Sequence, residues 1–258
     1  MSTNEINSVL IENRRFDPPA DFASKARIKM ADLDALNKQA EQDYEGFWAD
    51  QARQHIDWNK PFSKVLDESN APHFKWFEDG VLNVSYNCID RHLADSADKT
   101  AIIFEGEAGD THLISYQRLH DDVCQFANAM KAKGIKKGDR VGIFMPNTPQ
   151  FVMAYFAVLK LGAIVVAINP LYTAPELVHQ TNDAGLEVML VMSNFYNMVK
   201  EVQPKTKIKT LVVTNIKETL PSILAFLFTL TKEKKDGFRI QLAENDHWMQ
   251  DLINAHQP

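Results

Sequence analysis

Residues 139–192 constrain the fold more than any other part of the sequence, because three short apolar runs are separated there by two helical segments. Residues 139–145, 163–168 and 187–192 are rich in β-forming side chains and are bounded by charged or turn-forming residues. Each run therefore predicts a buried strand.

The segments between these strands carry helix signals. Thr148 is placed to cap a helix over 150–161, with proline at its first position, and this helix is apolar nearly all round. Thr173 and Glu176 form the pattern of a capping box, which starts a second helix that runs to Gly185. Alternating strands and helices with short links predict a parallel sheet flanked by helices, with right-handed crossovers.

A ligand of such a sheet is expected beyond the carboxyl ends of its strands, which places Asn147 and residues 169–173 on the candidate rim. A phosphate ligand also needs a glycine-rich turn whose backbone N–H groups can approach it. The glycines here are dispersed, and neither Gly-x-Gly-x-x-Gly nor Gly-Lys-Ser/Thr occurs. The sequence therefore argues against a dinucleotide-binding protein and leaves a nucleotide site incomplete.

Charge and composition restrict the partners. The net charge of -6 argues against nucleic acid, because neutralising phosphates requires a basic surface. The start of the chain lacks the basic and apolar regions of a signal peptide, and two cysteines provide no disulfide framework. We therefore expect a cytoplasmic protein. No apolar run approaches the roughly 20 residues that span a bilayer.

The first third of the chain predicts a helical and irregular extension before the sheet. Residues 1–20 form a polar arm, and residues 21–54 favour helix and end in the aromatics Tyr44, Phe47 and Trp48. These aromatics are expected to pack on a core, although a ligand-stacking surface is the alternative.

Further elements surround the predicted sheet. Residues 86–94 favour helix, residues 99–105 and 111–115 predict a β-hairpin, and residues 119–130 place apolar side chains on one helical face. A fourth parallel strand is expected over 210–214.

The apolar run at residues 220–230 is followed by three lysines within residues 232–235. We expect an internal helix that covers the sheet, or one that docks on a part of the protein absent from this sequence. A membrane-surface helix is the alternative, but such helices need a clear polar face and this run shows little of one.

Two Cys/His pairs have helical i, i+4 spacing, Cys88 with His92 and His120 with Cys124. Together they could supply four zinc ligands, but a buried cysteine beside a surface histidine explains the same residues. Neighbouring carboxylates such as Asp121 and Asp122 diverge on a helix and are weak acid/base candidates. We therefore assign no catalytic, cofactor-binding or metal-ligating residue in this sequence.

Several segments of the chain match a known family, namely Asp43-Tyr-Glu-Gly-Phe-Trp48, Trp58-x-Lys-Pro-Phe62, Lys75-Trp-Phe-x-Asp-Gly-x-Leu-Asn83, Ser85-Tyr-Asn-Cys-Ile-Asp-Arg91 and Ser115-Tyr-Gln-Arg-Leu-His120. Through these segments more than half of the chain closely resembles the start of acetyl-CoA synthetases, which are AMP-forming ligases of the adenylate-forming superfamily.

From about residue 146 the sequence is more similar to long- and medium-chain fatty acyl-CoA ligases of the same superfamily. Met145-Pro-Asn-Thr-Pro-Gln150 and Asn169-Pro-Leu-Tyr-Thr173 carry this second resemblance. Acetyl-CoA synthetases have an arginine-rich CoA segment after the third strand, whereas residues 193–198 here contain no arginine. That CoA contact is not transferred to this chain.

The resemblance implies a domain order of a polar arm at 1–20, an acetyl-CoA synthetase-like region at 21–87 and a truncated AMP-binding ligase domain at 88–258. Complete relatives use ATP, Mg and CoA to convert a carboxylic acid, acetate or a fatty acid, into acyl-CoA. Four elements of these relatives are missing here. They are the phosphate loop ending in Pro-Lys-Gly, the Tyr-Gly-x-Thr-Glu segment, the aspartate that binds ribose and the lysine of the mobile C-terminal domain.

We therefore expect this chain to be the N-terminal part of a ligase. By itself it should bind no cofactor and be inactive, and it should self-associate through its truncated edge. The alternative is a non-catalytic binding module or a relic of the family.

Overall fold

The computed structural model describes residues 16–106, 109 and 111–258. Residues 1–15 of the predicted polar arm lie outside this range. The chain divides into two compact units, with residues 1–56 and 62–80 in unit 1 and residues 57–61 and 81–258 in unit 2.

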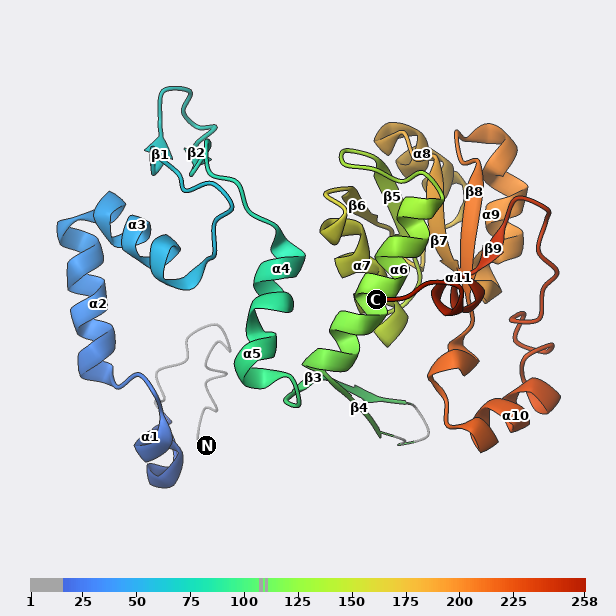
Figure 1. The fold of residues 1–258 in the computed structure, drawn as a ribbon, viewed down its shortest axis with the longest axis horizontal. Helices are drawn as coiled ribbons and strands as arrows, with labels where there is room; N and C mark the ends of the chain where they lie inside the picture. Colours follow the sequence, from blue (N-terminus) through green and yellow to red (C-terminus); the bar gives the residue numbers. More distant parts are fainter. Residues whose placement is uncertain (1–15, 107–108, 110) are drawn as a thin grey trace, which may run out of the picture. The chain divides into compact units, whose positions relative to one another are not determined.

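Unit 1 consists of short helices followed by a small antiparallel strand pair (Figure 1). Its elements are α1 (Ala20–Lys25), α2 (Met30–Gln42), α3 (Tyr44–His55), β1 (Leu66–Asp67) and β2 (Lys75–Trp76). The predicted helical stretch is divided at Asp43, whose backbone leaves the helical conformation and whose Oδ1 accepts a hydrogen bond from Gly46 N at 2.9 Å. Asp43 thereby ends α2 and caps α3.

The aromatic residues of α3 pack within unit 1. The rings of Tyr44 and Trp48 contact Trp76 edge-on, with centroids 5.8 and 6.3 Å apart. All three side chains stay partly exposed, and α2 has no buried residue. The aromatics therefore form a surface cluster rather than a closed core.

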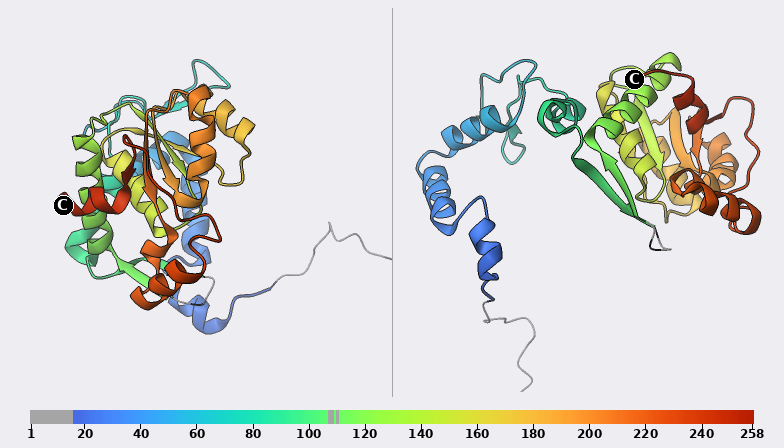
Figure 2. Two further views of the ribbon diagram at one scale, coloured as in Figure 1. Left: turned by 90° about the vertical axis from the view of Figure 1, so that its right-hand side faces the viewer. Right: turned by 60° about the horizontal axis from the view of Figure 1, so that its bottom comes forward.

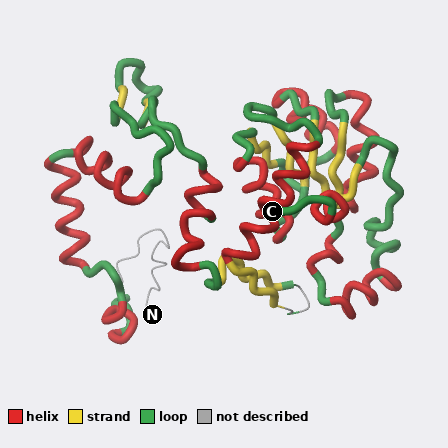
Figure 3. Tube along the Cα trace, in the orientation of Figure 1, coloured by secondary structure: helices red, strands yellow, loops and turns green. Residues whose placement is uncertain are grey.

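Unit 2 holds the sheet and most of the helices (Figures 1 and 3). Before the sheet come α4 (Val84–Cys88), η1 (Asp90–His92), α5 (Leu93–Ser96), β3 (Thr100–Glu105), β4 (Thr111–Ser115) and α6 (Tyr116–Ala132). The sheet region contains β5 (Arg140–Phe144), α7 (Pro149–Lys160), β6 (Ile164–Ala167), α8 (Ala174–Ala184), β7 (Val188–Met192), η2 (Ser193–Phe195), α9 (Tyr196–Val202), η3 (Gln203–Lys205) and β8 (Thr210–Thr214). The last elements are η4 (Ile216–Thr219), α10 (Ser222–Thr231), β9 (His247–Trp248) and α11 (Met249–Asn254).

The sheet has the strand order β6-β5-β7-β8-β9, and every neighbouring pair is parallel. The four strands predicted from the sequence are therefore confirmed, as is the antiparallel hairpin of β3 and β4. The two-residue strand β9 was not predicted, because so short a segment shows no alternation of apolar side chains. The helix predicted over 86–94 is interrupted by η1.

Helices cover both faces of this sheet (Figure 2). Ile143 and Leu190 point to the core that α6, α7 and α11 complete, whereas Phe144 and Val191 point to the core shared with α8 and α9. All four side chains are fully buried. Successive side chains of each buried strand thus point to opposite faces of the sheet, and helices cover both faces. This three-layer α/β arrangement confirms the predicted fold class.

The ends of α8 follow from its sequence. Glu176 Oε2 accepts a hydrogen bond from Thr173 N at 2.8 Å, so the predicted capping box is confirmed. Gly185 ends the helix with φ at 63°, a left-handed conformation that glycine adopts without a steric penalty. This turn directs the chain into β7.

The apolar run at 220–230 forms α10, but this helix does not cover the sheet. No residue of α10 is buried, and the helix lies at the periphery of unit 2 (Figure 1). The prediction of an internal covering helix is therefore wrong. Within the described residues, no helix is both long and apolar enough to cross a membrane.

Candidate functional site at the carboxyl edge of the sheet

The carboxyl ends of the parallel strands meet at one edge, and polar residues follow three of them directly. Thr148 and Gln150 follow β5, Ser193 follows β7, and Asn215 and Glu218 follow β8. All except Glu218 are buried. This edge is where ligands of open α/β sheets bind.

Several of these buried polar groups have no hydrogen-bond partner among the described residues. They are Thr148 Oγ1, Gln150 Oε1, Ser193 Oγ and Asn194 Oδ1. Burying an unpaired polar group is costly, so such atoms are normally paired with protein, water or a ligand. The carboxyl edge of the sheet therefore has polar atoms available for hydrogen bonds at the place where ligands of such sheets bind.

Thr148 corrects one prediction from the sequence. Its hydroxyl was expected to cap α7, but the helix has no side-chain cap hydrogen bond. The backbone carbonyl of Thr148 instead accepts from Phe151 N at 3.0 Å, and the hydroxyl stays buried and unpaired. Proline at the first position already removes one N–H group that a cap would satisfy.

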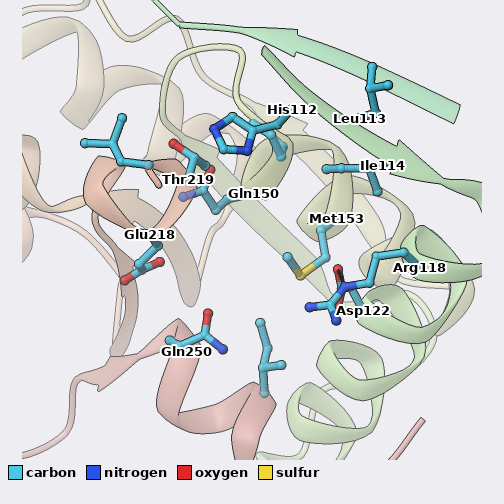
Figure 4. Close-up of a pocket in the computed structure, with 13 residues that line it drawn as sticks. His112, Leu113, Ile114, Arg118, Asp122, Gln150, Met153, Glu218, Thr219 and Gln250 are labelled. Atoms are coloured by element: carbon cyan, nitrogen blue, oxygen red, sulfur yellow. Dashed lines mark hydrogen bonds and ion pairs between the residues drawn. The ribbon is translucent and has the colours of Figure 1, made fainter. Parts of the chain in front are cut away.

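A cavity of about 290 Å³ opens at this edge between β4, α6, α7, η4 and α11 (Figure 4). Its polar lining residues are His112, Arg118, Asp122, Gln150, Glu218, Thr219 and Gln250, and Met153 and Ile253 are among the apolar ones. Gln150 Nε2 donates to Asn215 O at 3.3 Å, which holds the amide in place. Its Oε1 is left as the unpaired acceptor described above.

Both acidic groups of this cavity have a raised pKa. Although Glu218 as a whole residue is exposed, burial of its carboxyl group raises the pKa, against the opposing effect of hydrogen bonds that the carboxylate accepts from Thr214 Oγ1 at 2.6 Å and Asn215 N at 3.1 Å. Burial likewise raises the pKa of Asp122. Arg118 acts in the opposite direction, because its Nε donates a hydrogen bond to Asp122 Oδ2 at 2.9 Å and its charge favours the carboxylate.

A second cavity of about 440 Å³ shares Glu218 and Gln250 with the first. Besides the shared Glu218, its charged lining residues are Lys217, Glu233, Arg239 and Asp251. Glu233 is buried and lies 2.6 Å from Lys217 Nζ and 3.4 Å from Arg239 Nη2, so the two cations are already paired. They are not available as a separate anion site.

The residues that the sequence predicted at the ligand-binding rim do not line these cavities. Asn147 follows β5 and is exposed, and Asn169 follows β6, where its Oδ1 accepts from Leu171 N at 3.0 Å in a turn. Neither residue lines the two cavities. Gln150 and Glu218 were missed, because a glutamine inside an apolar helix and a glutamate in a polar loop carry no motif.

The two Cys/His pairs do not come together. Cys124 Sγ lies 3.4 Å from His120 Nε2, but Cys88 is exposed and His92 packs against the ring of Tyr116. Burial raises the pKa of the Cys124 thiol. In the part of the chain that the structure describes, no three His, Cys, Asp or Glu side chains are grouped to hold a metal ion.

A third cavity, of about 490 Å³, lies near the carboxyl end of α7, away from the edge described above. Trp58, Tyr86, Asp90 and Lys160 line it, and Lys160 Nζ donates a hydrogen bond to Asp90 Oδ1. The third charged lining residue, Asp57, lies 3.5 Å from Arg91 Nη1 through its Oδ1. Each charged group of this cavity thus has an ionic partner, which favours a structural role.

Residues 89–246 match the family model of AMP-binding enzymes, which spans more than half of the chain. The chain belongs to this family. Residues 33–88 match the model of the acetyl-coenzyme A synthetase N-terminus. The membership predicted from the sequence is therefore confirmed.

The relatives are similar over nearly the whole chain. An acetyl-coenzyme A synthetase of Nitrosomonas europaea is 41% identical over 254 residues, which cover 98% of this chain and 38% of the relative. One from Cupriavidus pinatubonensis is 42% identical over 256 residues, with the same coverage. The chain thus spans about 38% of the length of these relatives.

A solved structure supports the fold. An anthranilate CoA ligase in complex with anthranoyl-AMP superposes with a TM-score of 0.53 at 21% identity, over 67% of this chain and 28% of that one. At this identity the likeness shows the fold alone. The resemblance of the second part of the chain to fatty acyl-CoA ligases stays a prediction.

Proposed function

We propose that this chain is the N-terminal part of an AMP-forming acyl-CoA ligase and is inactive by itself. In the proposed whole reaction, a carboxylate attacks ATP to give an acyl-adenylate and diphosphate, and the CoA thiol then displaces AMP. The observation that supports this most directly is the alignment of acetyl-coenzyme A synthetases with 98% of the chain over 38% of their own length.

The carboxyl edge does not fit the phosphates of ATP. Gln150 Oε1, Glu218 and Asp122 present an amide acceptor and two carboxyl groups. Arg118 also lines the cavity but is paired with Asp122, whereas phosphate oxygens require available donors and positive charge. The sequence also offers no glycine-rich phosphate loop. We therefore assign ATP and Mg binding to residues outside this chain, and CoA and the carboxylic acid as ligands of the whole enzyme.

The unpaired groups of the edge support a contact with another part of the site. Thr148 Oγ1 and Ser193 Oγ are buried hydroxyls that can both donate and accept. In the proposed enzyme they are satisfied by ligand, by ordered water or by the remaining polypeptide. The chain thus contributes the scaffold and one wall of the site.

Fragment complementation tests this proposal. The chain alone should give no ATP–pyrophosphate exchange above background with acetate, octanoate or palmitate. Adding the remaining C-terminal portion of the Nitrosomonas europaea relative, itself inactive, should restore acyl-hydroxamate formation with at least one of these acids. The C-terminal portion alone is the control.

The outcomes separate the two candidate functions. Exchange by the isolated chain would show that its activity does not depend on a second part. Failure to restore activity, although the two parts associate, would favour the non-catalytic module. Self-association of the chain and a cytoplasmic location stay predictions from the sequence.

A further inference from the structure

Helix α10 exposes a continuous apolar face. Ile223, Phe226 and Leu230 follow one another at helical i, i+3 and i+7 spacing and are 76%, 63% and 66% exposed. Leu224 and Leu227, on the flanks of this face, are exposed as well. Few monomeric proteins leave so many large apolar side chains in water on one short helix without a partner.

The opposite face of α10 holds the helix to unit 2. The ring of Phe228 contacts Phe238 edge-on with centroids 5.5 Å apart, and Phe238 packs against the main core. Arg239 Nη2 donates a hydrogen bond to Thr229 O at 2.9 Å. Because these contacts fix the inner face, the apolar face of Ile223, Phe226 and Leu230 points outward.

A basic cluster follows the helix directly. Lys232, Lys234 and Lys235 are all exposed. Two acidic residues stand among them in the sequence, Glu233, which is buried, and Asp236, which is exposed. The nearby Lys217 is neutralised by buried Glu233, whereas no ion pair within the described part of the chain involves the three lysines. This local positive charge contrasts with the net charge of -6 of the whole chain.

We infer that α10 and the three lysines dock this chain on the surface of an anionic lipid bilayer, with the helix lying in the plane of the interface. Ile223, Phe226 and Leu230 would enter the boundary between headgroups and acyl chains, and Lys232, Lys234 and Lys235 would contact anionic headgroups. The inner face of the helix, packed on unit 2, takes the place of the polar face that a free interfacial helix needs. The ten-residue helix is too short to span the bilayer.

Charge complementarity favours lipid over a second copy of the chain. A two-fold contact through α10 would bring the lysines of both copies towards each other, which is unfavourable. An anionic surface instead satisfies the apolar and the basic groups together. The inference concerns a different surface from the carboxyl edge of the sheet, but the remaining polypeptide of the proposed ligase is a competing occupant of this face. Loss of vesicle binding on adding the C-terminal portion of the relative would assign the face to that polypeptide and overturn the inference.

Vesicle sedimentation tests the inference on the whole 258-residue chain. Vesicles of phosphatidylcholine with 30% phosphatidylserine should bind the chain, and vesicles of phosphatidylcholine alone should bind it about tenfold or more weakly, since each lysine near an anionic surface contributes roughly a fivefold effect. Phe226→Asp with Leu230→Asp should abolish binding. Lys232→Gln, Lys234→Gln and Lys235→Gln together should weaken binding to the anionic vesicles about tenfold or more.

A matched control uses another exposed apolar pair of unit 2. Ile103 and Leu113 face each other across the hairpin of β3 and β4 and are similarly exposed. Ile103→Asp with Leu113→Asp should leave vesicle binding unchanged. Circular dichroism would establish that each variant is folded.

A fluorescent variant distinguishes insertion from surface attraction. Phe226→Trp should show a blue shift on adding anionic vesicles and should be quenched by lipids brominated on the acyl chains. Equal loss of binding in the hairpin control, no quenching of Phe226→Trp, or self-association through α10 without vesicle binding would each overturn the inference.

Discussion

Lys217 Nζ lies 2.6 Å from Glu233 Oε1, and this ion pair joins the turn after β8 to the segment after α10. Glu233 is buried, and it also accepts a hydrogen bond from Asn215 Nδ2 at 3.2 Å. The position of α10 thus depends on a carboxylate that water does not reach.

Removing the cation of this pair should destabilise unit 2. Lys217→Ala leaves the buried Glu233 carboxylate with the neutral amide of Asn215 and the more distant Arg239 as partners, so we expect the free energy of unfolding to fall by about 2 kcal/mol. Urea denaturation measures this change. The matched control is Lys209→Ala, whose partner Glu187 is exposed; that variant should change stability by less than about 0.5 kcal/mol. Equal effects of the two substitutions would contradict the structural role of Glu233.

Asp246 should be a second stabilising carboxylate. It is buried, and it accepts hydrogen bonds from Tyr196 Oη at 2.7 Å, Leu211 N at 3.0 Å and Lys200 Nζ at 3.1 Å. Asp246→Ala leaves these donors without their acceptor and should cost about 3 kcal/mol.

A double-mutant cycle with Tyr196→Phe isolates one of these contacts. The coupling energy between Asp246 and Tyr196 should be about 1 kcal/mol in the stabilising direction. Strict additivity of the two substitutions in urea denaturation would show that their hydrogen bond contributes nothing.

The unpaired hydroxyl of Ser193 should be a cost to the chain without ligand. Ser193→Ala removes a buried oxygen without a partner, and we expect the free energy of unfolding to rise by about 1 kcal/mol. Ser85→Ala is a matched control, because its hydroxyl is equally buried and unpaired but lies in α4, away from the edge of the sheet. Only Ser193→Ala should also weaken complementation by the C-terminal portion of the relative. A loss of stability in Ser193→Ala would show that the hydroxyl has a partner such as ordered water.

The sheet could be predicted from the sequence because its strands are buried on both faces and read as continuous apolar runs, as residues 188–192 do. The site could not, since Gln150 and Glu218 become neighbours only when α7 and η4 converge on one edge. The position of α10 was mispredicted for a related reason. Apolar composition indicates that a helix needs a partner, but which surface it meets depends on tertiary contacts such as that of Lys217 with Glu233.

Glu218 should give the chain a distinctive dependence of stability on pH. Burial raises its pKa in the folded state above the ordinary value of 4.5, so the folded chain binds more protons than the unfolded chain above that pH. The difference in free energy of unfolding between wild type and Glu218→Gln should therefore fall as pH rises from about 4.5 towards neutrality.

Glu176 provides a control of opposite sign: the hydrogen bonds from Thr173 lower its pKa, and wild type should lose stability relative to Glu176→Gln as pH falls below 4.5. Urea denaturation of the three proteins between about pH 3 and pH 7.5 makes the comparison. A difference for Glu218→Gln that is constant or rises with pH would mean that the hydrogen bonds from Thr214 and Asn215 outweigh burial, and that the carboxylate is charged in the folded chain.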